Sequence, residues 1–275
     1  MRLHTHIQGQ GFPILCLHGH PGSGEAMSVF TGPLAQQFKT YAPDLRGYGR
    51  SRTAYPFEME RHLDDLEELL ARYQIEDCLV LGWSLGGILA MELALRKPHT
   101  IRGLILIGTA ARPRGSHPPI TWQDNVMTGL AGALNWALPA SPLALALGEK
   151  SLFRYLIGEH TPEAYRYLAS QGAPAYLGTS RHAEAALFNA IRAGYDRLVD
   201  IRSLSMPSLM LCGEGDRHIT AASSIETAQA LLNCELHCYP DVAHLFPWEI
   251  PHRMNADIRA WLAAHPQIWQ RPVPC

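Results

Sequence analysis

Short apolar runs and amphipathic stretches alternate along the first 110 residues and again after residue 206. Continuous apolar runs are typical of strands buried on both faces of a sheet, and apolar positions three and four apart predict helices. The expected strands cover residues 3–8, 12–17, 40–43, 78–81, 101–107, 208–212 and 235–239. The expected helices in the same regions cover residues 25–38, 57–73, 88–96, 221–231 and 250–264. This alternation predicts a mostly parallel central sheet covered by helices on both faces.

The alternation stops in the middle of the chain, where the pattern predicts helices and no strand. Four helices are expected there, near residues 121–137, 143–157, 161–170 and 182–194, with prolines that open or separate them. The chain is therefore expected to comprise a core of residues 1–110, an all-helical lid of residues 111–205 and the second part of the core at 206–275. A chain of 275 residues is long enough for one large domain with such an insertion.

One stretch raises the possibility of a membrane helix. Residues 125–148 carry no charge and are nominally long enough to span a bilayer. Pro139 and Pro142 would break a spanning helix, so two lid helices with apolar faces are favoured. The amino terminus also lacks the long apolar segment of a signal peptide.

The cysteines bear on the cellular compartment in which the protein is expected. None of the six shows the paired spacing of a metal site, and three lie within predicted strands, namely Cys16, Cys78 and Cys212. Reduced, buried cysteines are typical of a cytosolic protein, so we expect a cytoplasmic location. The formal net charge of −2 argues against nucleic acid or an anionic membrane as the main partner.

The strongest chemical signal is the segment GWSLGG at residues 82–87, between a predicted strand and a predicted helix. A serine on so tight a turn is held with its hydroxyl exposed, and a Cβ at Gly82 or Gly86 would collide with the neighbouring chain. The backbone N–H of Leu85, at the helix N-terminus, is placed to face a developing oxyanion. The pattern G-x-S-x-G arises by chance about 0.1 times in a chain of this length. The sequence therefore predicts that Ser84 is a nucleophile.

We call this strand-to-helix turn with its serine the nucleophile elbow. With this elbow, the chain resembles the α/β-hydrolase fold over essentially its whole length. The chain order of that fold, serine, then acid, then histidine, implies an acid after the strand that follows the lid and a histidine after the last strand. The resemblance places the acid at Asp216, in preference to Glu214 or Asp241, and the histidine at His244. His244 would accept the proton of Ser84, and Asp216 would fix the tautomer of His244 and stabilise its imidazolium form.

The resemblance also implies a second oxyanion donor. Residues 18–21, His-Gly-His-Pro, match the family's His-Gly-x-Pro loop, so the backbone N–H of His20 would join that of Leu85, while His18 would brace the loop. The side chain of His20 has two open alternatives: a polar element of the acyl pocket, or a group that faces solvent. Residues 44–51 resemble the family's D-x-R-G-x-G-x-S turn, whose role is structural.

Two tryptophans are candidates for the substrate pocket. Trp83, beside the nucleophile, is expected to form pocket wall or to pack beneath the lid. Trp136 belongs to the apolar surface of the lid, part of which can line a pocket for an acyl chain. The lid is therefore expected to favour short to medium acyl chains.

The elbow implies acyl transfer to water, and a hydrolase of small to medium carboxylic esters is the leading interpretation. Lactonases, carbon–carbon bond hydrolases and cofactor-free perhydrolases have similar elbows and remain alternatives. A more distant alternative is a hydrolase-fold protein that only binds ligands, although this chain retains all three triad candidates. A serine at the elbow argues against haloalkane dehalogenases and epoxide hydrolases, which place an aspartate there. The elbow and lid together more weakly resemble pimeloyl-carrier-protein methyl ester esterases.

The implied partners and cofactors follow from charge and motif content. Residues 112–205 carry a net charge of +2, against −4 for the rest of the chain, which would attract an acidic acyl carrier protein. Ordinary scatter of surface charge is favoured as the explanation over a carrier-protein site. The sequence contains no phosphate loop, metal-ligand cluster or cofactor motif, so neither a cofactor nor a metal is expected. It leaves the oligomeric state open.

Overall fold

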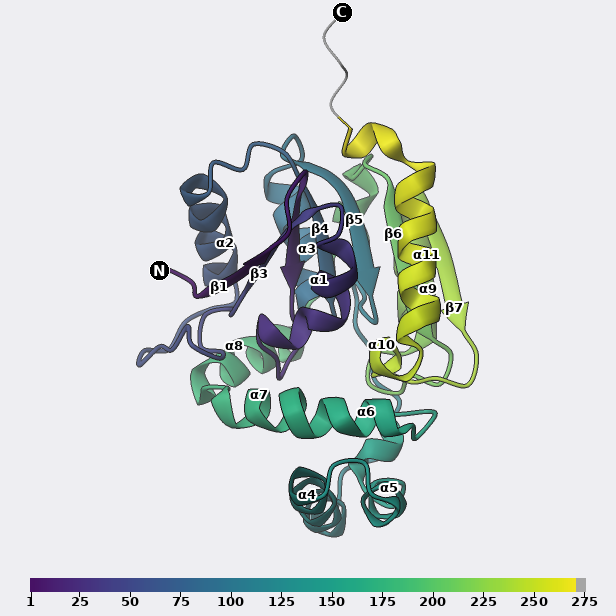
Figure 1. Ribbon diagram of the computed structural model, residues 1–275. Helices are drawn as coiled ribbons and strands as arrows, with labels where there is room; N and C mark the ends of the chain where they lie inside the picture. Colours follow the sequence, from purple (N-terminus) through teal and green to yellow (C-terminus); the bar gives the residue numbers. More distant parts are fainter. Residues whose placement is uncertain (271–275) are drawn as a thin grey trace, which may run out of the picture.

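The computed structural model describes residues 1–270 and contains a seven-stranded sheet in the order β1-β3-β2-β4-β5-β6-β7 (Figure 1). The strands are β1 (Thr5–Gln8), β2 (Pro13–Leu17), β3 (Lys39–Pro43), β4 (Cys78–Trp83), β5 (Ile101–Ile107), β6 (Ser208–Gly213) and β7 (Cys234–Tyr239). At one edge β1 pairs antiparallel with β3, and all the other pairs are parallel. The predicted mostly parallel sheet is confirmed.

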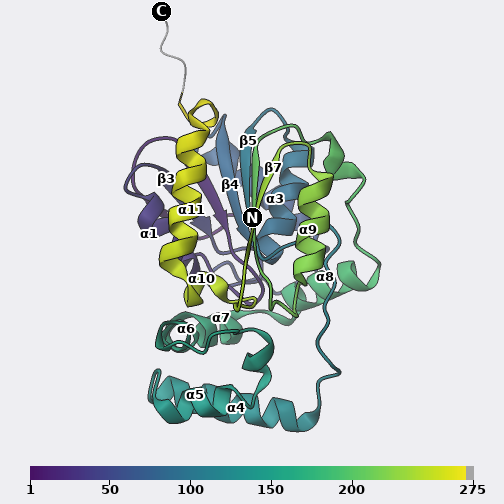
Figure 2. The same ribbon diagram turned by 90° about the vertical axis from the view of Figure 1, so that its right-hand side faces the viewer.

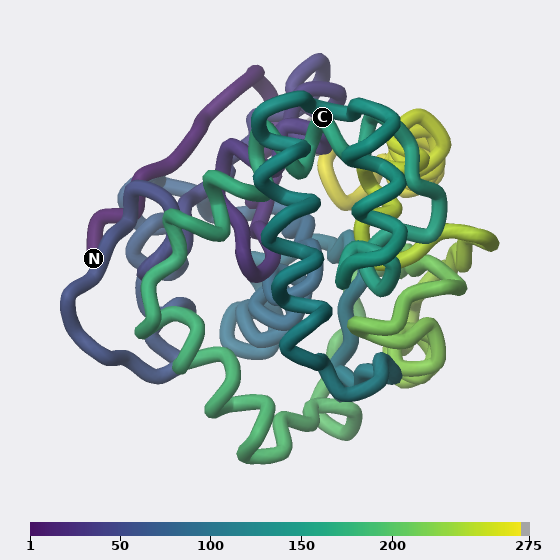
Figure 3. Tube along the Cα trace, turned by 90° about the horizontal axis from the view of Figure 1, so that it is seen from below, coloured from purple at the N-terminus to yellow at the C-terminus, as the bar shows by residue number. Residues whose placement is uncertain are grey.

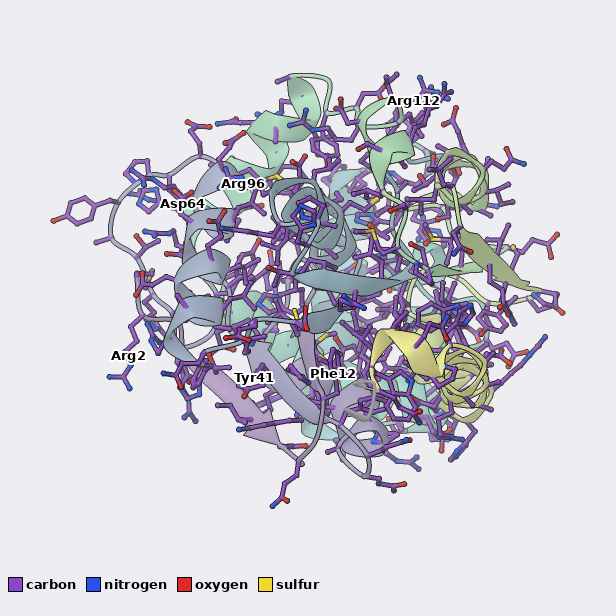
Figure 4. All side chains as sticks on the ribbon, turned by 90° about the horizontal axis from the view of Figure 1, so that it is seen from above. Arg2, Phe12, Tyr41, Asp64, Arg96 and Arg112 are labelled. Atoms are coloured by element: carbon purple, nitrogen blue, oxygen red, sulfur yellow. The ribbon has the colours of Figure 1, made fainter. Side chains whose placement is uncertain are left out.

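Helices cover both faces of the sheet because the side chains of its central strands alternate between two apolar cores. On β4, Leu79 and Leu81 lie in one core and Val80 in the other. The helices on the Val80 side are α2 (Glu60–Arg72), α3 (Leu85–Arg96) and α9 (Ala221–Ala230), and those on the other side are α1 (Ser28–Leu34) and α11 (Pro251–Ala264). Figure 2 shows α3 and α9 on one side of the sheet and α1 and α11 on the other. Arg96 of α3 and Asp64 of α2 form an ion pair at 3.0 Å at the surface between these helices (Figure 4).

The described residues between β5 and β6 form helices and no strand, and we call residues 111–205 the insert. Its helices are α4 (Trp122–Ala137), α5 (Pro142–Gly148), α6 (Pro162–Tyr167), α7 (Ala173–Gly178) and α8 (Arg181–Arg192). The insert lies below the carboxyl ends of the parallel strands, with α6 and α7 nearer the sheet than α4 and α5 (Figure 1). Seen from below, α4 and α5 lie side by side in front of the rest of the molecule (Figure 3).

Two insert helices differ from their predicted lengths for tertiary reasons. The helix expected over 143–157 ends at Gly148, and only a short 3₁₀ turn, Leu152–Tyr155, follows it. At Gly148 the Tyr165 hydroxyl occupies the space that a Cβ would need. The helix expected over 161–170 continues to Gly178 through a π-helical segment, Leu168–Gly172. Such a turn changes the hydrogen-bond register just before Pro174, which has no N–H to donate.

Several smaller expectations can be compared directly. The helix expected over 25–38 is shorter, because a 3₁₀ turn, Glu25–Met27, precedes α1 and α1 ends at Leu34. Within residues 1–270, no helix is long and apolar enough to cross a bilayer. The five described cysteines are free thiols, and those in β2, β4 and β6 are buried; Cys275 lies outside the described residues.

Candidate active site

The segment around Ser84 forms a sharp turn at the end of β4 and the start of α3. Ser84 has φ of 55° and ψ of −118°, a conformation that side-chain-bearing residues rarely adopt. A Cβ at Gly82 would collide with the carbonyl group of Gly86, and a Cβ at Gly86 would collide with the carbonyl group of Leu17. Strand and helix approach this closely only because both positions are glycine.

Ser84, Asp216 and His244 come together although they lie far apart in the chain. The His244 Nε2 atom lies 3.1 Å from Ser84 Oγ, and His244 Nδ1 lies 2.7 Å from Asp216 Oδ2. The other oxygen of Asp216 accepts the backbone N–H groups of His218 and Ile219 at 2.8 and 2.9 Å, which fixes the orientation of the carboxylate. All three triad candidates are buried.

The rival acids lie elsewhere. Glu214 and Asp241 are exposed, and the hydrogen bond of His244 Nδ1 goes to Asp216. Asp241 has φ of 63° in the turn after β7, a conformation that aspartate tolerates better than most residues. The structure thus brings together the three residues that the family resemblance selected and leaves these two at the surface.

The loop at residues 18–21 passes directly beside Ser84. A Cβ at Gly19 would lie 3.0 Å from Ser84 Cβ and 2.7 Å from the Trp83 ring. His18 is buried, and its Nε2 accepts the backbone N–H of Leu45 at 3.0 Å while Nδ1 donates to the Gly19 carbonyl at 2.7 Å. Burial lowers the pKa of His18 to about 4, so the ring is neutral and can accept from Leu45.

His20 follows Gly19, which lies beside Ser84, and Leu85 follows Ser84 itself, so their backbone N–H groups are the candidates for the oxyanion hole. Within residues 1–270, neither N–H has a hydrogen-bond acceptor in the protein. Buried N–H groups are normally paired, and two unpaired donors beside Ser84 suit an oxygen that develops negative charge.

The side chain of His20 contacts both the core and the insert. Its Nδ1 lies 2.9 Å from the hydroxyl of Tyr48, which is fully buried, and its ring meets Phe188 of α8 edge-on at a centroid distance of 5.7 Å. Burial lowers the pKa of His20 to about 4 and raises that of Tyr48 above its usual range. Of the two alternatives, a group that faces solvent does not fit, because the imidazole is half-buried and bonded to Tyr48.

The two tryptophan candidates differ sharply in environment. Trp83 is buried, with its ring 5.5 Å from that of His244 and 4.7 Å from that of Trp248, and Trp248 stacks at 3.7 Å on Tyr167 of the insert. Trp83 thus packs beneath the insert and beside the triad. Trp136 lies on α4 and is 70% exposed, so its ring does not wall an enclosed pocket.

Sequence reasoning missed Glu249, at the end of the short helix α10 (Phe246–Glu249). Its buried carboxylate accepts three backbone N–H groups, from Gly158 at 3.0 Å, Glu159 at 2.6 Å and Ala243 at 3.3 Å. Burial raises the pKa of Glu249 to about 7, against the effect of these three bonds. The sequence signal was a single carboxylate directly after the apolar run at residues 245–248.

A second residue missed from sequence is His218, two positions after Asp216. Its ring centroid lies 4.8 Å from that of His244.

Away from the triad, His4, His6 and Asp44 bring possible metal-ligand atoms within 4.8 Å of one another.

The fold agrees with the comparisons to known proteins. Residues 13–251 match the family model of the alpha/beta hydrolase fold, and the chain belongs to this family. It is 28% identical over 270 residues to a pimeloyl-[acyl-carrier protein] methyl ester esterase from Nitrosospira multiformis, covering 93% of this chain and 96% of that one. It is 30% identical over 274 residues to a 2-hydroxymuconate semialdehyde hydrolase from Pseudomonas putida, covering 95% and 91%.

Solved structures support the fold. A thermophilic esterase from Thermogutta terrifontis superposes with a TM-score of 0.70 at 24% identity, covering 98% of this chain and 94% of that one. Est816, described as an N-acyl homoserine lactone degrading enzyme, superposes with a TM-score of 0.69 at 21% identity, covering 94% and 96%. At these identities, the similarity establishes the shared architecture alone.

Proposed function

We propose that the protein is a serine hydrolase that cleaves carboxylic esters of small to medium acyl chains through an acyl-enzyme. The observation that carries this proposal is the hydrogen-bonded series from Asp216 through His244 to Ser84, at 2.7 and 3.1 Å. A serine hydroxyl alone is a weak nucleophile at neutral pH, and this arrangement supplies both the base and the carboxylate that orients it.

In the first half-reaction, Ser84 Oγ attacks the ester carbonyl carbon while its proton passes to His244 Nε2. The carbonyl oxygen becomes an oxyanion, which accepts hydrogen bonds from the N–H groups of His20 and Leu85. The bond to the alcohol oxygen then breaks as His244 returns the proton to that oxygen. The alcohol leaves, and the acyl group remains on Ser84.

In the second half-reaction, water replaces the alcohol. His244 takes a proton from the water as its oxygen attacks the acyl carbon, and the oxyanion forms again. When the bond to Ser84 Oγ breaks, His244 returns the proton to that oxygen, so the carboxylic acid and the free serine are released. Asp216 stabilises the imidazolium form in both halves. The insert, whose Tyr167 stacks on Trp248 beside the elbow, is proposed to act as the lid.

The test uses Ser84→Ala with p-nitrophenyl butyrate as substrate and a fluorophosphonate as covalent probe. The variant should lose labelling and about 10⁴–10⁶ in kcat while keeping the wild-type circular dichroism spectrum. Ser170→Ala, at an exposed serine of the insert, is the matched control and should be labelled like the wild type. Hydrolysis by Ser84→Ala at near the wild-type rate would remove the basis of the proposal.

Carbon–carbon bond hydrolysis is the second candidate, because the Pseudomonas putida relative is a 2-hydroxymuconate semialdehyde hydrolase. The same triad would serve both reactions. A panel of esters, lactones and dienoic diketones, assayed on one enzyme preparation, separates the candidates. A kcat/KM for the diketone above that for every ester would favour the second function.

A carrier-protein substrate is supported by the Nitrosospira multiformis relative and by the net charge of +2 on residues 112–205. The acyl methyl ester tethered to acyl carrier protein should then have a higher kcat/KM than the free methyl ester. High salt should reduce that difference, because it screens the attraction between surfaces. Equal kcat/KM values for the two substrates, with no salt dependence, would mean that the enzyme acts on free esters. The cytoplasmic location is a separate prediction, which this experiment does not test.

A further inference from the structure

His4, His6 and Asp44 converge at the edge of the sheet, away from the triad. His6 lies in β1 opposite Ala42 of β3, His4 immediately precedes β1, and Asp44 immediately follows β3. Residues two apart on a strand point to the same face, and the two rings lie 4.9 Å apart at 87° to each other. The Asp44 N–H donates to the His4 carbonyl at 2.8 Å, which holds the aspartate beside the histidine pair.

The two imidazole rings of this cluster form no hydrogen bond with any other described residue. Nε2 of His4 is buried with no hydrogen-bond partner among the described residues. Across residues 1–270, no hydrogen bond joins either ring to the Asp44 carboxylate, although one possible ligand atom from each residue lies within 4.8 Å of the other two. Three converging donor atoms without mutual bonds are the arrangement that a cation would complete.

The carboxylate of Asp44 is held in a fixed orientation, as a metal ligand would be. The residue is 2% exposed, and each carboxylate oxygen accepts one backbone N–H, from Gly24 and from Arg50, both at 2.7 Å. Each oxygen keeps a second lone pair, and hydrogen bonds of this kind orient carboxylates that bind metals. The nearby guanidinium of Arg46 is engaged with Asp65, so it does not neutralise Asp44.

We propose that His4, His6 and Asp44 bind one divalent transition-metal ion, with zinc as the best match to two imidazoles and a carboxylate. Imidazole ligands disfavour magnesium and calcium, which prefer oxygen. Ligand atoms around a tetrahedral zinc lie about 3.3–3.5 Å apart, since each bond is about 2.0–2.1 Å long. Small rotations of the two half-buried rings would close the remaining distance, and water would fill the open position.

The position of this site indicates a structural role. Asp44 precedes Leu45, whose N–H bonds His18 in the loop beside Ser84, and His4 also donates its N–H to Ser51 Oγ at 2.9 Å. A metal here would fasten the amino-terminal edge strand to the turn at residues 44–51. It would take no part in the chemistry at Ser84.

The test is zinc binding to metal-free protein without a polyhistidine tag, measured by calorimetry, with cobalt absorption as a second readout. The wild type should bind one equivalent and gain in Tm, because the ion binds the folded state. His4→Ala and His6→Ala should lose both effects, whereas His99→Ala, at an exposed histidine outside the cluster, should keep them. His6→Gln retains a polar side chain in case His6→Ala does not fold.

Two results would overturn the proposal. One is the lack of stoichiometric binding by the wild type; the other is unchanged binding by correctly folded His4→Ala or His6→Gln, which would place the ion on other histidines. Ester hydrolysis is measured in parallel on the metal-free protein. Failure of the metal site would therefore leave the hydrolase proposal intact.

Discussion

The carboxylate of Glu249 accepts the backbone N–H of Glu159 at 2.6 Å, and this bond fastens the insert to the loop that carries His244. The same carboxylate accepts the N–H of Ala243, the residue before His244. A second bond, from the Leu245 N–H to the Leu156 carbonyl at 2.7 Å, joins the same two segments. We therefore expect Glu249 to be a positioning residue, which holds the imidazole of His244 through the backbone.

Glu249→Gln should lower kcat with little change in KM. The amide can accept only through its oxygen, so one buried N–H loses its partner, at a cost of about 1–3 kcal/mol in the free energy of unfolding. Steady-state kinetics and urea unfolding measure both effects. Glu159→Ala is the matched control, because it removes a neighbouring carboxylate and keeps the N–H that Glu249 accepts. Unchanged kcat in Glu249→Gln would show that the imidazole is held by other contacts.

The difference in stability between the wild type and Glu249→Gln should depend on pH. Burial raises the pKa of Glu249 from 4.5 to about 7, so the folded protein binds this proton more tightly than the unfolded chain does. Its contribution to the free energy of unfolding therefore falls as the pH rises from about 4.5 to 7, and is constant above that. The stability advantage of the wild type over Glu249→Gln should shrink across this interval. A constant difference would contradict the raised pKa.

Asp216→Asn should lower kcat by about 10⁴, by analogy with the same change in a serine protease triad. The asparagine amide would donate to His244 Nδ1 and leave the proton on Nε2, so the ring could not accept from Ser84. Asp241→Asn and Glu214→Gln, both at exposed positions, are the controls and should be nearly neutral. A severe loss at either control with none at Asp216 would reassign the acid.

His20 and Tyr48 should be coupled in stability. His20→Ala keeps the backbone N–H beside Ser84 but leaves the buried Tyr48 hydroxyl without its partner, at a cost of about 1–3 kcal/mol. Adding Tyr48→Phe should recover part of that loss, which a double-mutant cycle in urea measures. Tyr55→Phe, at a tyrosine that is 79% exposed, should change nothing. Additive losses in the cycle would mean that the two side chains do not interact.

Phe188 should influence acyl-chain preference more than Trp136 does. Phe188 meets His20 edge-on at 5.7 Å, whereas Trp136 is 70% exposed on α4. Phe188→Ala should raise the rate on p-nitrophenyl octanoate relative to butyrate, and Trp136→Ala should leave this ratio unchanged. The opposite pattern would assign the acyl pocket to the outer helices of the insert.

The sequence predicted the sheet and the elbow because both depend on local signals. The run 78–81 is apolar at every position since both faces of β4 are covered, and the glycines around Ser84 are required by the turn itself. Asp216 and His244 could be assigned only through the chain order of a known fold. Their approach to Ser84 depends on loops whose conformations have no periodic pattern.

Other features could not be predicted because they depend on remote partners. Glu249 binds backbone N–H groups, which every residue type carries, so its partners leave no trace in the sequence. Pro174 suggested a helix boundary, and only the π-helical turn before it allows the helix to continue. The apolar character of Trp136 was evident, but the side of α4 that faces solvent is decided by packing within the insert.

The left-handed backbone of Ser84 has a practical consequence for engineering. Holding a side-chain-bearing residue at φ of 55° and ψ of −118° costs on the order of 1–3 kcal/mol, and the native fold bears this cost only for the sake of the hydroxyl. Ser84→Gly would relieve the strain, whereas Ser84→Ala would retain it. A selection for thermostability alone would therefore enrich inactive glycine variants, and directed evolution of this scaffold needs an activity screen at every round.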